Sequence, residues 1–154
     1  MTASVSTLPW SKRLALWTED NLWLIVIVLA ALAVRLHWNL EAHPPGEYIY
    51  SDMRGYSRRA DSMFKNLWGV REYDAFYPYG THVMLWFLEW VGGRTAETKP
   101  DELPRIYEFV AGVYAVYGAA LAGYGYALAR RVSQFKIVPP IVGLLLVVYY
   151  PLIS

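Results

Sequence analysis

The chain has 154 residues, of which 56% are hydrophobic and 16% aromatic, and its 14 basic and 13 acidic side chains leave a net charge of +1. Such a small charge argues against a basic nucleic-acid-binding protein, and no nucleic-acid partner is expected. The chain contains no cysteine and therefore forms neither a disulfide nor a thiolate metal site. This composition is typical of a membrane protein.

The first predicted element is a transmembrane helix over about residues 22–40. It holds the apolar run LWLIVIVLAALAV, followed by Arg35, whose guanidinium can extend to the headgroup level near a helix end. The alternative is a signal peptide, because the basic residues Lys12 and Arg13 precede the run. The sequence RLHW follows it instead of a small-residue cleavage site, which favours an uncleaved anchor.

Residues 41–104 are predicted to form a large loop that begins with a Pro-Pro-Gly helix breaker. Within it, apolar residues at helical spacing predict a helix over about residues 52–67. Ser51 or Asp52 can cap the amino end of this helix.

A second short helix is expected over about residues 81–91. It is too short to cross a membrane, and Glu89 interrupts its apolar run. We expect it to lie on the membrane surface, and Gly92 and Gly93 to end it. Its aromatic side chains are expected at headgroup depth: Trp86, Phe87 and Trp90.

Two more transmembrane helices are expected at about residues 109–129 and 137–154. Neither segment carries a formal charge, and each can cross a hydrocarbon core of about 30 Å. The earlier of the two carries small residues at four-residue steps, which allow another transmembrane helix or membrane subunit to approach closely. These residues are Ala111, Ala115, Ala119 and Gly123.

The predicted fold is therefore an all-α membrane protein, a single membrane domain over residues 1–154 with three transmembrane helices. Short basic segments of membrane proteins favour the cytoplasm. The amino terminus and the basic connection at residues 130–136 are accordingly placed inside, and the loop of residues 41–104 outside.

Several features together resemble a known family. They are a basic-flanked first helix ending in an arginine, Asp52 followed four residues later by Tyr56, the aromatic-Pro-x-Gly-Thr stretch of residues 77–81, and a helix ending in Ala-Arg-Arg. This combination resembles the amino-terminal part of GT-C fold integral-membrane glycosyltransferases, in the bacterial branch of protein mannosyltransferases and aminoarabinose transferases. The resemblance extends from about Asn21 to Ser154.

The resemblance implies transfer of a sugar from a polyprenyl-phosphate donor to an acceptor on the outer face of the bacterial cytoplasmic membrane. Asp52 matches the first-loop acid of the family and would act as a general base or as a ligand of a divalent cation. The family usually pairs this acid with a second one, whereas Met53 follows here. The alternative is that Asp52 only caps a helix.

The resemblance also assigns substrate-binding roles to tyrosines and to a cluster of arginines. Arginine binds phosphate bidentately, and Arg54 and Arg58 share a helix face. The alternative for the arginines is contact with bulk lipid headgroups or ion pairs with Asp61 and Glu72. The other assigned residues are Arg59, Tyr56, Tyr79 and His82, the last of which would orient an acceptor or serve as a structural hydrogen-bonding group.

The sequence offers no histidine and carboxylate spacing typical of a dedicated zinc site. Relatives of the GT-C family continue through more helices, so this chain is expected to be inactive alone. A fragment, a degenerate enzyme and a non-catalytic subunit of a larger membrane complex remain open as alternatives.

Overall fold

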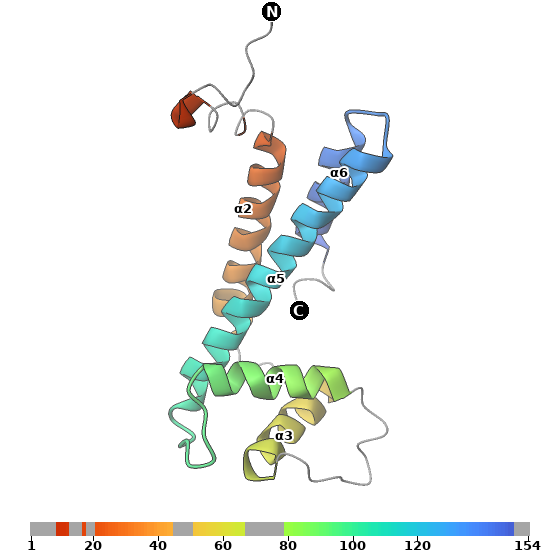
Figure 1. The fold of residues 1–154 in the computed structure, drawn as a ribbon. Helices are drawn as coiled ribbons and strands as arrows, with labels where there is room; N and C mark the ends of the chain where they lie inside the picture. The colour runs from red at the N-terminus through yellow and green to blue at the C-terminus, as the bar shows by residue number, and fades with distance from the viewer. Residues whose placement is uncertain (1–8, 13–16, 18–20, 45–50, 67–78, 150–154) are drawn as a thin grey trace, which may run out of the picture. The chain divides into compact units, whose positions relative to one another are not determined.

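The computed structural model describes residues 9–12, 17, 21–44, 51–66 and 79–149, with side chains at all of these positions except 51–54 and 79. The described part is helical, with connecting turns, and contains no strand (Figure 1). Its elements are α2 (Leu22–His37), the π-helical turn η2 (Trp38–Ala42), α3 (Ser51–Lys65), α4 (Tyr79–Val91), α5 (Leu103–Val132) and α6 (Val138–Val148).

The chain divides into two compact units. We call the first the apolar unit; it contains α2 up to Val34, α5 from Tyr117 onward, and α6. We call the second the loop unit; it extends over Arg35–Val116 and contains α3 and α4.

Two helices are long and apolar enough to cross a membrane, namely Leu22–Ala42, in which η2 continues α2, and Leu103–Val132. At about 1.5 Å per residue, the first of them is about as long as a hydrocarbon core is thick. It ends where the N–H of His43 donates to the carbonyl of Trp38 at 2.8 Å, and Pro44 follows. The spans expected at residues 22–40 and 109–129 lie within these two helices, which are candidate membrane spans by their length and apolar composition.

Of the third expected span, residues 137–154, the described part contains the 11-residue helix α6. Pro139 and Pro140 occupy its first turn, where their missing N–H groups would have no helical partner. Tyr149 has an extended backbone, and residues 150–154 lie outside the described part of the chain. An 11-residue helix extends about 16 Å, so α6 as described is too short to cross a bilayer alone.

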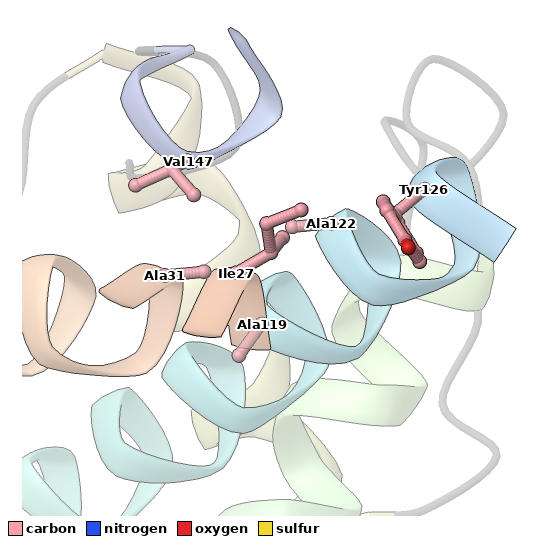
Figure 2. Close-up of a cluster of buried hydrophobic side chains, with 6 residues drawn as sticks. All are labelled: Ile27, Ala31, Ala119, Ala122, Tyr126 and Val147. Atoms are coloured by element: carbon pink, nitrogen blue, oxygen red, sulfur yellow. The ribbon is translucent and has the colours of Figure 1, made fainter. Parts of the chain in front are cut away.

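Small residues bring the helices of the apolar unit close together (Figure 2). A Cβ atom at Gly123 of α5 would lie 2.7 Å from Val28 of α2, and a Cβ at Gly143 of α6 would overlap Ile27. Side chains this close exclude anything larger than glycine unless the neighbour moves. The buried core that results consists of Ile27, Ala31, Ala119, Ala122, Tyr126 and Val147.

The stripe of small residues on α5 therefore faces another helix, and that helix is in the same chain. Gly123 contacts α2, Ala119 shares the core with it, and within the loop unit Asn39 donates a hydrogen bond to the carbonyl of Ala111 at 3.3 Å. Ala115 is fully buried. The predicted approach of a further helix or membrane subunit to this stripe stays a prediction.

Arg35 differs from its expected position. Its side chain is 0% exposed and takes part in an interaction within the chain. A guanidinium that is fully covered by protein cannot reach lipid headgroups, so that prediction is wrong.

In the loop unit, α3 packs against α4. The helix expected over 52–67 extends over Ser51–Lys65, and the one expected over 81–91 begins earlier, at Tyr79. As predicted, the two glycines end α4: Gly93 has a φ of +96°, a conformation that glycine adopts at low cost. The residues expected to bind substrate lie on these two helices.

Candidate functional site

Three of the predicted site residues fall where the side chains are not described. Asp52 and Arg54 lie in the first turn of α3, and Tyr79 is the first residue of α4. Their side chains lie outside the described part of the structure, so their predicted roles stay predictions.

The neighbouring arginines of α3 have opposite environments. Arg58 is exposed, and among the described residues it has no ion-pair partner. Arg59 is only 8% exposed and takes part in an interaction within the chain. Asp61, which the sequence offered as their ion-pair partner, binds Arg94 instead. Arg58 is therefore the cation of this pair that an external anion can reach.

Tyr56 and His82 are also covered to different degrees. Tyr56 is half-buried, whereas His82 of α4 is 2% exposed and interacts within the chain. A ring with so little accessible surface is in no position to contact an acceptor in this conformation. The burial of His82 favours its structural alternative.

The loop unit contains a largely buried ionic cluster that we call the acidic joint: Asp61 of α3, Glu89 of α4, and Arg94, which follows α4. Arg94 Nη1 donates to Glu89 Oε2 at 2.5 Å, and Arg94 Nη2 lies 2.5 Å from Asp61 Oδ1. The Glu89 side chain is 0% exposed and that of Arg94 is 10% exposed, whereas 45% of the Asp61 side chain remains exposed. One guanidinium therefore links the end of α4 to α3.

The backbone at the end of α4 explains why Arg94 reaches Glu89. The N–H of Gly93 donates to the carbonyl of Trp90 at 3.0 Å, and the N–H of Arg94 donates to the carbonyl of Glu89 at 2.9 Å. These two bonds form a Schellman motif, which brings the residue after the glycine back over the last turn of the helix. In many Schellman motifs the side chains at these two positions make an apolar contact, whereas here Glu89 and Arg94 form an ion pair.

Burial changes the proton affinity of both charged partners. Desolvation raises the pKa of Glu89 to about 7, with the Asp61 charge adding to this effect and the Arg94 guanidinium opposing it. For Arg94, desolvation lowers the pKa, but the carboxylates of Glu89 and Asp61 outweigh it and leave the pKa above its usual value. Glu89 is therefore poised to gain or lose a proton near neutral pH, while Arg94 stays charged.

Aromatic rings enclose the acidic joint on one side. The Arg94 guanidinium lies 5.0 Å from the centre of the Phe64 ring, a cation–π geometry. Phe64 is 6.1 Å from Trp86, and Trp86 stacks with Trp90 at 6.5 Å between ring centres. Trp86 therefore packs against α3, and its indole nitrogen is buried. Its predicted headgroup depth stays a prediction.

The acidic joint was missed in the sequence, where Glu89 appeared only as an interruption of an apolar run. Its signal is the stretch EWVGGR: an acid in the last turn of a helix, a glycine pair that ends the helix, and an arginine immediately after. The chain reversal at the glycines then makes a contact between the acid and the arginine predictable. Asp61 could not be found in this way, because it joins through the packing of α3 on α4.

No group of three or more His, Asp or Glu side chains suited to a metal ion occurs among the residues that the structure describes. The carboxylate predicted as a cation ligand, Asp52, has no described side chain. In comparisons with protein-family models, with curated proteins and with solved structures, no match to the chain was found.

Proposed function

We propose that the chain is the amino-terminal module of a GT-C-type integral-membrane glycosyltransferase, which uses a polyprenyl-phosphate-linked sugar on the outer face of a bacterial cytoplasmic membrane. The observation that supports it is the order of elements. Two long apolar helices, α2 and α5, flank a charged segment whose described part folds into two packed helices, and the first of these carries Asp52 in its first turn.

The distribution of exposed apolar residues supports a membrane environment for the long helices. A core helix of a soluble protein is covered by its neighbours, whereas large apolar side chains on α2, α5 and α6 remain accessible. Lipid would cover these side chains. Examples are Trp23, Val26 and Leu29 on α2, Leu121 and Leu128 on α5, and Leu144 and Leu145 on α6.

The proposed topology has the amino terminus and residues 130–136 in the cytoplasm and residues 41–104 outside. Within the apolar unit, Arg130 Nη1 lies 3.4 Å from Asn21 Oδ1, so the start of α2 and the end of α5 lie at the same end of that unit. Antiparallel helices of this kind place both basic segments on one side. In this arrangement α6, with the residues after it, forms the third crossing.

In this reading α4 lies in the outer interface of the membrane. Its exposed apolar residues occur at positions i, i+4, i+7 and i+8, which is one face of a helix, while Glu89 is buried on the protein side. The exposed face consists of Val83, Phe87, Trp90 and Val91. Such a helix would hold the loop unit at the depth of a lipid phosphate.

The residues of α3 would then act on the lipid-linked donor and the acceptor. Asp52 would accept the proton of the acceptor hydroxyl or bind a divalent cation, and Arg58, exposed and without an ion pair among the described residues, would donate to the donor phosphate. Arg54, Tyr56 and Tyr79 would complete the substrate contacts. Buried Arg59 and His82 would support the two helices.

Further transmembrane helices are required by this proposal, either from the same polypeptide or from another subunit, because donor and acceptor must be enclosed and aligned. The test is sugar transfer by membranes that contain the complete assembly. Asp52→Asn keeps the size and capping ability of the side chain but removes its charge, and we expect it to abolish transfer. Asp101→Asn, at an exposed position before α5, is the matched control and should transfer normally.

Transfer at the normal rate by the Asp52→Asn variant would leave Asp52 with a capping role only. If no assembly that contains the chain transfers sugar, and the chain instead purifies in fixed proportion with another membrane complex, the alternative of a non-catalytic subunit replaces the proposal.

A further inference from the structure

Glu89 is a carboxylate with no access to solvent and with only half of its hydrogen-bonding capacity used. Its side chain is 0% exposed, and Oε2 accepts the bond from Arg94. Oε1 is also buried, and no donor among the described residues reaches it. A buried carboxylate oxygen without a donor destabilises the ionised form much more than the protonated form.

The charges of the acidic joint do not balance. Glu89 and Asp61 share the one guanidinium of Arg94, so the cluster has one negative charge in excess when both acids are ionised. Asp61 is 45% exposed, and water can stabilise its charge. Glu89 has no such contact, so it is the place where the excess charge is most readily neutralised.

We infer that Glu89 is a proton-binding site, with the proton on Oε1, and that loss of this proton favours separation of the end of α4 from α3. The reaction is a simple exchange: Glu89 releases H⁺ to the surrounding water and becomes a carboxylate. The exposed side of Asp61 gives the cluster its contact with that water. The inference does not depend on the proposed enzymatic function.

The groups that act on Glu89 come from each neighbouring element. Asp61 acts from α3 and Arg94 from the segment after α4, while Tyr107 of α5 acts on Arg94. Burial has a larger effect on the pKa of Glu89 than any of these charges, and the pKa is raised to about 7. A proton is therefore exchanged within the pH range of most cells and their surroundings.

The direction of the effect follows from linkage. The packed arrangement has a pKa of about 7 for Glu89, compared with 4.5 for an ordinary exposed glutamate. Protonation therefore stabilises the packed arrangement, and the equilibrium constant for opening rises as pH increases from 4.5 to 7 and then levels off. Between pH 6 and pH 8 it should rise roughly tenfold.

The first test is a titration of the purified chain in lipid nanodiscs, observed through the ¹³C resonances of labelled glutamate carboxyls. We expect one carboxyl to titrate near neutral pH, and this signal to be missing in Glu89→Gln but present in Glu97→Gln, whose site is exposed. Asp61→Asn should lower the midpoint, because it removes the negative charge that adds to the effect of burial. If every glutamate titrates below pH 5.5, Glu89 is not the proposed proton site.

The second test measures the opening itself by amide hydrogen exchange of α3 and α4, corrected for the intrinsic effect of pH. Exchange from the open state should increase roughly tenfold between pH 6 and pH 8 in the wild-type chain and in Glu97→Gln. In Glu89→Gln it should not depend on pH. A corrected rate that is equal at both pH values in the wild-type chain would overturn the coupling between the proton and the packing. Should Glu89→Gln fail to fold, the wild-type measurements and the Asp61→Asn midpoint still decide the outcome.

Discussion

Arg94 and Glu89 are joined twice, by a main-chain hydrogen bond of 2.9 Å and by a side-chain hydrogen bond of 2.5 Å. The main-chain bond lies in the turn that ends α4. The side-chain bond positions the Arg94 guanidinium, which also forms an ion pair with Asp61 of α3. A single arginine therefore contributes both to the end of α4 and to its packing against the preceding helix, α3.

Arg94→Ala should be among the most destabilising changes in the loop unit. It leaves Glu89 buried without its cation, and removal of one partner of a buried ion pair costs about 3–5 kcal/mol. Without Arg94 the pKa of Glu89 rises further, so the loss should be larger at pH 8 than at pH 6, where Glu89 can be neutral. Chemical unfolding in mild detergent at both pH values measures this difference.

Arg105→Ala is the control for that change, because Arg105 is exposed near the start of α5. It should alter the free energy of unfolding by less than about 0.5 kcal/mol. Equal losses in the two variants would mean that Arg94 contributes only as an ordinary surface cation.

Gly93→Ala should destabilise the chain by about 1 kcal/mol, because a residue with a side chain is strained at a φ of +96°. Gly80→Ala in the first turns of α4 is the matched variant. Neither glycine has an atom within 4 Å of an added Cβ, so steric overlap is absent in both, and only the backbone conformation differs. We expect thermal unfolding to show a loss for Gly93→Ala alone.

Gly143→Ala should weaken the packing of the apolar unit. The added methyl group would overlap the end of Ile27, whose side chain is 0% exposed and has little room to move. Overpacking of this kind costs about 1–3 kcal/mol. Gly112→Ala, in open space on α5, should be tolerated, and detergent unfolding of the two variants tests the contrast.

Arg58→Gln should weaken binding of polyprenyl phosphate to the chain in nanodiscs by about tenfold or more, as expected for loss of a charge-assisted hydrogen bond. Native mass spectrometry can measure the bound fraction, with Arg105→Gln as the control of equal charge. If both variants lose binding equally, the phosphate is attracted by general positive charge and Arg58 has no specific role.

The proposed topology can be tested with introduced cysteines, since the chain has none of its own. Ala96→Cys, in the loop unit, should react with an impermeant thiol reagent in intact cells, whereas Ser133→Cys, between α5 and α6, should react only after the membrane is opened. Labelling of position 133 alone in intact cells would invert the orientation and move Asp52 to the cytoplasmic face.

The sequence was sufficient for features that depend on local chemistry. The uncharged runs predicted the long helices α2 and α5, and the glycine pair predicted the end of α4, because helix length and termination are set by neighbouring residues. The helix α5 extends a few residues beyond the predicted bounds at each end. Charged residues such as Arg105 and Glu108 mark the end of an apolar stretch, but they do not end a helix. The uncharged run of residues 137–154 predicted a full span, whereas the described helix α6 ends at Val148. Composition alone therefore did not determine the length of this helix.

Only the tertiary structure decided which polar residues are covered. Periodicity identifies the residues that share a helix face, but it does not say which face meets another helix. Arg35 was therefore expected at the headgroups and is fully buried, and Glu89, expected only to interrupt an apolar run, is enclosed with Arg94. Asp61 reaches this pair because α3 packs on α4, a contact between segments distant in sequence. Burial is what shifts the proton affinity of Glu89, and burial is a property of the packed helices that a sequence read residue by residue does not contain.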